Sequence, residues 1–203
     1  MKQLFKTFRT ATAALGMVLA MAAGSATAAS LDQFTPVIGG ATVSGAGAVT
    51  LGFTGIGFVG SGVASGGGIA GPVVLPSNSL TLTASGSSIV GGSFISVAPP
   101  FPFLNGSFED ARAESGVLSF LFAINSGAAA SIFGSHVIYT LNNPTFTTDT
   151  FSNLSLIQPP GTETVAPVSF SIKQVAPIPL PAGVILLLTG LGALGLARRR
   201  ASA

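Results

Sequence analysis

The chain has 203 residues, of which 48% are hydrophobic and only 7% are charged, and it contains no cysteine, which excludes disulfides and thiolate metal sites. Six of its eight basic residues lie at the two ends, so the segment between them carries two basic and six acidic residues, a net charge of −4. A charge of this sign gives no support for nucleic-acid binding.

Residues 1–28 are predicted to form a secretory signal peptide. Basic residues at the very start precede an apolar stretch at residues 11–23. Ala26 and Ala28 then have the spacing of a leader cleavage site, so the mature chain is expected to begin at Ala29. An N-terminal membrane helix is the alternative, but the apolar stretch is short for one.

The following segment, residues 33–108, has no charged residue and no histidine. Short β-prone runs separated by glycine predict many short strands and tight turns, and residues 80–84 alternate as a half-buried strand does. Glycine-rich disorder is the alternative. Residues 55–60 have the glycine spacing of a dinucleotide-binding turn, but no acidic residue follows until Glu109, so no nucleotide cofactor is expected.

The rest of the domain at residues 29–175, which we call the cargo domain, has more conventional patterns. Charged residues at 108–115 predict a short helical turn, whereas the apolar residues 117–124, covered on both faces, and residues 132–141 predict strands. Residues 168–173 alternate cleanly, with their apolar positions facing inward. Together these patterns predict a single all-β domain, a β-sandwich or jelly-roll-like fold.

Candidate catalytic and metal-binding residues are few. His136 is the only histidine, and its strand neighbour Ser135 is expected to face the opposite way, so the two would make no nucleophile–base pair. One histidine without cysteines does not complete a usual zinc site. Glu109, Asp110 and Glu114 lack the alternating spacing of a calcium loop, and no spacing among the acidic residues selects a catalytic pair. We therefore expect no enzyme, no catalytic residue, no metal and no cofactor.

Residues 176–203 are predicted to form a C-terminal sorting segment in three parts. A proline motif comes first, then an uncharged apolar run at residues 182–197, and last Arg198, Arg199 and Arg200. With the few residues before it, the run makes a transmembrane helix about 30 Å long, one hydrocarbon thickness. The arginines are expected to stay on the cytoplasmic side, and the prolines to keep the preceding chain extended. A plain C-terminal membrane anchor has the same features and is the alternative.

The proline motif consists of Ile178, Pro179, Leu180, Pro181 and Ala182. Followed by an apolar helix and terminal arginines, it resembles the VPLPA variant of the PEP-CTERM sorting signal, with isoleucine in place of the first valine. The resemblance is limited to this tail and the signal peptide. It implies a substrate of an exosortase, a membrane-embedded cysteine transpeptidase of Gram-negative bacteria, which would cleave near the motif. The chain would then be in the inner membrane only transiently, before it reaches the cell surface or the extracellular matrix.

The cargo domain is expected to be structural or adhesive, because a charge-poor, β-prone chain leaves its strand edges poorly protected against pairing. The expected partners are the exosortase, the inner membrane during transit, and an exopolysaccharide or further copies of the chain. A carbohydrate-binding module or a hydrolase on a β-sandwich is the alternative. Sugar binding usually requires exposed aromatic platforms, and the chain has no tryptophan and only one tyrosine, Tyr139.

Overall fold

The computed structural model of the protein describes residues 29–52, 54–86, 88–153 and 164–178. The predicted signal peptide, C-terminal helix and arginine stop lie outside these residues. Within the described ranges, no helix combines the length and the apolar character needed to cross a membrane.

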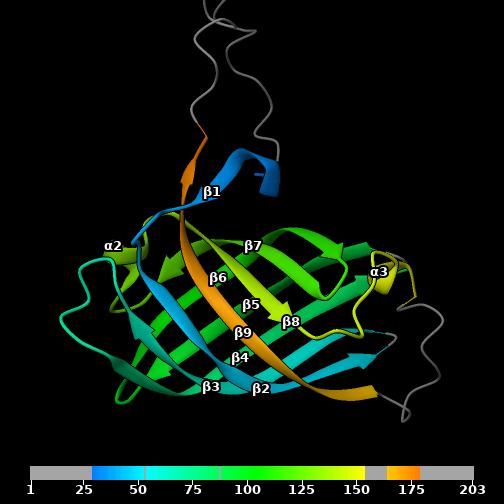
Figure 1. Ribbon diagram of the computed structural model, residues 1–203, viewed down its shortest axis with the longest axis horizontal. Helices are drawn as coiled ribbons and strands as arrows, with labels where there is room; N and C mark the ends of the chain where they lie inside the picture. The colour runs from blue at the N-terminus through cyan, green and yellow to red at the C-terminus, as the bar shows by residue number, and fades with distance from the viewer. Residues whose placement is uncertain (1–28, 53, 87, 154–163, 179–203) are drawn as a thin grey trace, which may run out of the picture.

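The domain is an eight-stranded antiparallel β-barrel with one additional short strand (Figure 1). Strands β2 to β9 follow one another around the barrel in sequence order, and β9 closes the ring by pairing with both β8 and β2. Strand β1 pairs only with the end of β9. The elements are η1 (Leu31–Gln33), β1 (Phe34–Pro36), β2 (Thr42–Gly52), β3 (Gly55–Ser65), β4 (Val73–Ser85), β5 (Ser88–Ala98), β6 (Phe101–Glu114), β7 (Val117–Ser126), α2 (Ala130–Phe133), β8 (His136–Asn142), α3 (Thr150–Asn153) and β9 (Thr164–Pro177).

The predicted all-β class is confirmed, but the predicted sandwich or jelly-roll arrangement is wrong, because one continuous sheet is rolled into a ring. The ring strands are 7 to 14 residues long rather than short. Long twisted strands joined in sequence order close into a barrel at about eight strands. Closure gives every ring strand two neighbours, so it removes the free edges on which the expectation of adhesion rested.

The charged segment at residues 108–115 is not a helical turn, as predicted, but lies mostly in strand β6. Asp110, Arg112 and Glu114 alternate there with Ala111 and Ala113, and the two alanines pack against the core. This is the period-two pattern of a strand. This alternation is hard to recognise in the sequence, because alanine is only weakly apolar and does not clearly mark an inward position.

The strand expected at residues 132–141 begins only at His136, because α2 precedes it. The strands expected at residues 117–124 and 168–173 are confirmed as parts of β7 and β9. The predicted inward positions of β9 are correct, since Val168, Phe170 and Ile172 are all buried. Their exposed fractions are 4%, 2% and 0%.

The barrel is filled by a cluster of aromatic side chains around Tyr139, which is fully buried. Its ring centroid lies 5.6 Å from that of Phe170 and 5.7 Å from that of Phe94. Phe58 and Phe122 lie at 6.0 and 6.3 Å. Within the described residues the Tyr139 hydroxyl has no hydrogen-bond partner. The barrel interior is therefore a packed apolar core, and one polar atom is buried in it unpaired.

Glycines on the inner face of β2 and β3 make room for these rings. Gly45 pairs across the strands with Gly62, and Gly47 pairs with Gly60. A Cβ atom at Gly62 would lie only 2.8 Å from Cζ of Phe170, so the ring rests directly on the glycine backbone. The glycine-rich half of the chain is therefore ordered, because its inward glycines are covered by aromatic rings, those of Phe58 on β3 itself and of Phe170 on β9.

Candidate functional site

The two ends of the described chain meet at one end of the barrel (Figure 1). Strand β9 pairs with β2 only as far as Lys173 and with β8 only as far as Gln174. Its last three residues, 175–177, pair instead with β1. The next backbone amide, that of Ile178, donates a hydrogen bond of 2.7 Å to the carbonyl of Gln33. The N-terminal segment therefore holds the point at which the chain leaves the barrel.

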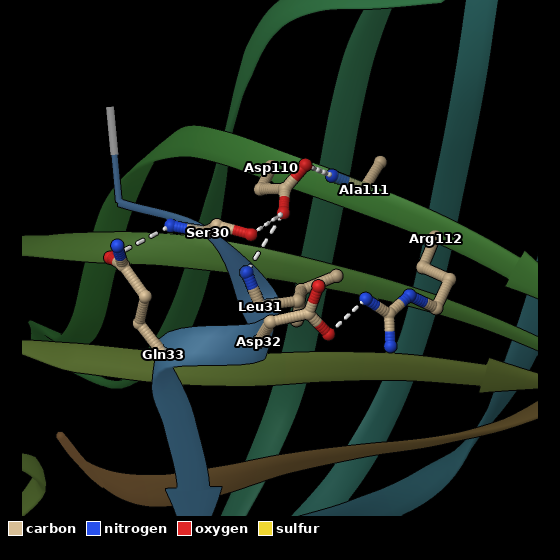
Figure 2. Close-up of polar contacts among 7 residues, drawn as sticks. All are labelled: Ser30, Leu31, Asp32, Gln33, Asp110, Ala111 and Arg112. Carbon is tan, nitrogen blue, oxygen red and sulfur yellow. Dashed lines mark hydrogen bonds and ion pairs between the residues drawn. The ribbon is translucent and has the colours of Figure 1, made fainter. Parts of the chain in front are cut away.

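This N-terminal segment, residues 30–36, which we call the strap, is fixed to the barrel by Asp110 on β6. Figure 2 shows that one carboxylate oxygen of Asp110 accepts hydrogen bonds from the backbone N–H of Leu31, at 2.8 Å, and from Oγ of Ser30, at 3.2 Å. The other oxygen accepts the backbone N–H of Ala111 at 2.9 Å. Charge-assisted bonds of this kind are stronger than neutral ones, so Asp110 is the main polar anchor of the strap.

An apolar contact surface accompanies this anchor. Leu121 lies between the inward residues Phe120 and Phe122 and so faces the outside of the barrel, yet it is fully buried. It pairs across the strands with Asp110, the residue that binds the strap. Leu31 is the buried side chain of η1. We infer that the strap supplies the outer cover of Leu121.

Asp32 and Arg112 form an ion pair beside this anchor (Figure 2). The hydrogen bond to Asp32 raises the pKa of Arg112 above its ordinary value, and the negative charge of Asp32 adds to the effect. Both side chains are substantially exposed, at 44% for Arg112 and 73% for Asp32. Solvent screens such a pair, so it contributes little to holding the strap.

His136 lies under the strap at the start of β8, and its surroundings correct the sequence analysis. Ser135 precedes the strand, so strand alternation does not apply to it, and its Oγ lies 2.9 Å from Nδ1 of His136. Nε2 of His136 lies 3.1 Å from Oε2 of Glu109, which has no hydrogen-bond partner among the described residues. The ring of Phe34 covers the imidazole, with 4.6 Å between the centroids.

A serine, a histidine and a carboxylate in a row are the components of nucleophilic catalysis, but such a reaction also needs a substrate groove and donors for an oxyanion. Two surface grooves among the described residues lie elsewhere on the barrel. One is lined by Thr50, Gly57 and Thr81, and the other by Ser93 and Asn105. Because Phe34 covers the imidazole, we interpret the row as part of the strap contact.

Metal binding has no support in the part of the chain that the structure describes. No group of three or more histidine, aspartate or glutamate side chains there is placed to hold a metal ion. Glu109 and Asp110 are neighbours in β6, but one faces His136 and the other binds the strap.

The predicted sorting motif begins where the sheet ends. Ile178 is the last described residue, follows β9 directly and is 47% exposed. The other residues predicted to act in sorting lie outside the described residues. These are Pro179, Leu180, Pro181, Ala182, Arg198, Arg199, Arg200, Ala26 and Ala28.

The sequence analysis did not predict the strap. Ser30 and Gln33 gave the only local signal, since a serine followed three residues later by glutamine is a helix-start pattern, and Gln33 Oε1 does accept the Ser30 amide at 3.3 Å. That pattern predicts a helical turn. It does not predict that the turn binds Asp110, which lies 80 residues from Ser30 in the sequence.

Comparison with protein-family models, with characterised proteins and with solved structures finds no match for this chain.

Proposed function

We propose that this chain is an exported envelope or matrix protein that is processed at its C-terminal proline motif by an exosortase-type transpeptidase. The observation that carries the proposal is that the chain enters and leaves the barrel at the same end (Figure 1). Strand β9 reaches Pro177, and the motif begins at the next residue. A barrel built in this way would stand directly on the outer face of the inner membrane, with the motif at the membrane surface.

The chemistry of processing would come from the transpeptidase, and this chain would supply only recognition. Enzymes that cleave peptide bonds bind their substrates in an extended conformation, and β9 already delivers the chain extended. Pro179 and Pro181 lack backbone N–H groups and restrict the chain to that conformation. Arg198, Arg199 and Arg200 would hold the tail in the correct orientation.

The mass of the intact mature protein from its native host tests the proposal. We expect a chain that begins at Ala29 or a close neighbour and lacks the apolar tail. A Pro179→Ala, Pro181→Ala variant should keep the tail and accumulate in the inner membrane. A Pro72→Ala variant is the control, because Pro72 is exposed and precedes β4, away from the motif. A surface-located mature chain that still carries its tail would show a plain membrane anchor instead.

For the cargo domain we propose a structural or adhesive role that uses strand faces rather than edges. The outer face of β3 and β4 presents Val59, Val63 and Val74, which are 66%, 39% and 68% exposed. Val63 and Val74 pair directly across the strands. Exposed apolar residues that cluster on one face are typical of contact surfaces. Concentration-dependent association of the purified protein, weakened by Val59→Thr and Val74→Thr together, would support this role.

Carbohydrate binding is the second candidate, favoured by one groove. A shallow depression of about 400 Å³ lies over β2, β3 and β4. Gly57, which pairs with Thr50 on one side and Thr81 on the other, lines it together with these threonines and Thr83. Binding on a glycan array, abolished by Thr81→Val, would favour this role over adhesion through the valine face.

A further inference from the structure

The strap has a consequence for any enzyme that must reach the C-terminal segment. We propose that the strap is a latch, so that residues 175–178 become accessible to a cleaving enzyme only when residues 30–36 detach from β9. The biological meaning of the latch depends on the proposed processing, but its mechanical behaviour can be measured separately.

The pairing of the last residues of β9 with β1 alone supports a latch. In the part of the chain that the structure describes, residues 175–177 have β1 as their only strand neighbour, whereas residues 169–173 of β9 are held on both sides by β2 and β8. Detaching the strap would therefore free the end of β9 without opening the ring. The backbone N–H of Val37, which donates to the carbonyl of Gln174 at 3.0 Å, marks where the strap joins the barrel.

The strap and a cleaving enzyme would also compete for the same backbone groups. A peptide-cleaving enzyme binds its substrate largely through main-chain hydrogen bonds, as an added strand does. The Ile178 amide and the β1 ladder of residues 175–177 are already engaged by the strap. An enzyme that binds this segment on the strap side must first displace β1.

The strap is attached more weakly than the strands of the ring are to one another. It is seven residues long, its ladder with β9 covers three residues, and its ion pair is exposed. Its main polar anchor is one side chain, Asp110. Its buried side chain, Leu31, lies outside the core cluster of the barrel, and short elements with few contacts to the core open locally while the core stays folded. The strap is therefore suited to open without unfolding the barrel.

A disulfide can lock the latch because the chain has no cysteine of its own. Thr35 and Ala176 are directly opposite in the β1–β9 ladder. Opposed antiparallel residues have Cα atoms about 4.5–5.5 Å apart, within the range of about 4.4–6.8 Å that a disulfide spans. Thr35→Cys with Ala176→Cys is therefore locked shut when oxidised, and when reduced its strap can open and close as the native strap does. Thr35→Cys alone is the control.

The opposite perturbation removes the anchor. Asp110→Ala should release the strap, whereas Glu114→Ala removes a carboxylate from the same strand without touching it. Hydrogen exchange of the full chain in detergent micelles reports the state of the latch at the Ile178 amide. We expect exchange there to be about tenfold faster in Asp110→Ala, a change of about 1.4 kcal/mol in the opening free energy, with the amides of β8 unchanged.

Access itself is measured by removal of the tail, both in the native host and by proteinase K added to the purified full chain. We expect Asp110→Ala to lose the tail about tenfold faster than the native sequence, and the oxidised double-cysteine variant to keep it until reductant is added. Tail removal from the oxidised variant at the native rate would overturn the latch, as would unchanged exchange at Ile178 in Asp110→Ala. If the host leaves the native tail intact, the proposed processing fails, while the order of the variants with proteinase K still decides the latch.

Discussion

The inward glycines of β2 and β3 give the sharpest test of how this barrel is packed. In Gly62→Ala the new Cβ would lie 2.6 Å from the carbonyl oxygen of Ser44 and 2.8 Å from Cζ of Phe170. The first contact is with the backbone of β2, which is paired with strands on both sides, so this carbonyl oxygen cannot move without disturbing those hydrogen bonds. The second would displace a ring whose centroid lies 5.1 Å from that of Phe58 and 5.6 Å from that of Tyr139.

The size of the effect follows from two opposing terms. Overpacking a core costs about 1–3 kcal/mol, and a backbone contact places this variant near the upper limit. Replacing glycine by alanine returns about 0.4–1 kcal/mol, because the unfolded chain loses freedom. Gly62→Ala should therefore lower the free energy of unfolding by about 2 kcal/mol.

Gly57→Ala is the matched control in the same strand. Gly57 faces outward, and the nearest atom to its added Cβ would be Cβ of Thr50 at 3.8 Å. This variant should be as stable as the native chain or gain up to about 0.5 kcal/mol. Urea and thermal unfolding followed by far-ultraviolet circular dichroism should separate the two midpoints by about 5–10 °C. Equal stability of the two variants would refute the argument that rings rest on bare glycine backbone.

Two further predictions concern ionisable groups. Burial holds the pKa of Tyr139 well above its ordinary value of 10.0. The unfolded chain therefore loses this proton first, and stability should fall above about pH 10 by up to about 1.4 kcal/mol per pH unit. Because Tyr139 is the only tyrosine, its tyrosinate absorbance should appear together with unfolding. Tyr139→Phe should abolish the loss of stability at alkaline pH. Ionisation of Tyr139 in the folded barrel would contradict this prediction. Arg112→Ala breaks the exposed ion pair with Asp32, so the free energy of unfolding in urea should fall by less than about 0.5 kcal/mol, and the difference should vanish in high salt. A fall of more than about 1 kcal/mol would show that the pair anchors the strap.

Local periodicity predicted the strands that alternate between clearly apolar and clearly polar residues. Residues 168–173 are the best case, because Val168, Phe170 and Ile172 all proved to face the core. Alternation says which residues face inward, but it does not say whether the inner face closes on itself or packs against a second sheet. The difference between a barrel and a sandwich depends on which strands pair, and the β2–β9 pairing joins segments too distant for local patterns to report.

The glycine-rich half and the strap were hard to predict for related reasons. Gly45 and Gly62 have no side chain, so they give no inward signal, although their lack of a side chain is what lets Phe170 pack. The strap depends on Asp110, whose role is set by a contact with Ser30 across the fold. In both cases the decisive partner lies far away in the sequence.

Ring closure through β9 also sets the order in which the chain can acquire its structure. The pairing of β2 with β9 brings Thr42 opposite Lys173, so the first and last ring strands are neighbours. A chain that emerges N-terminus first can form the hairpins from β2 to β8, but it keeps an open edge on each outer strand until β9 arrives. Contacts between such distant segments form slowly, and open edges invite pairing with other chains. The interval before the final strand pairs is therefore the one of greatest aggregation risk, and any chaperone that protects this barrel would have to shield the edges of β2 and β8.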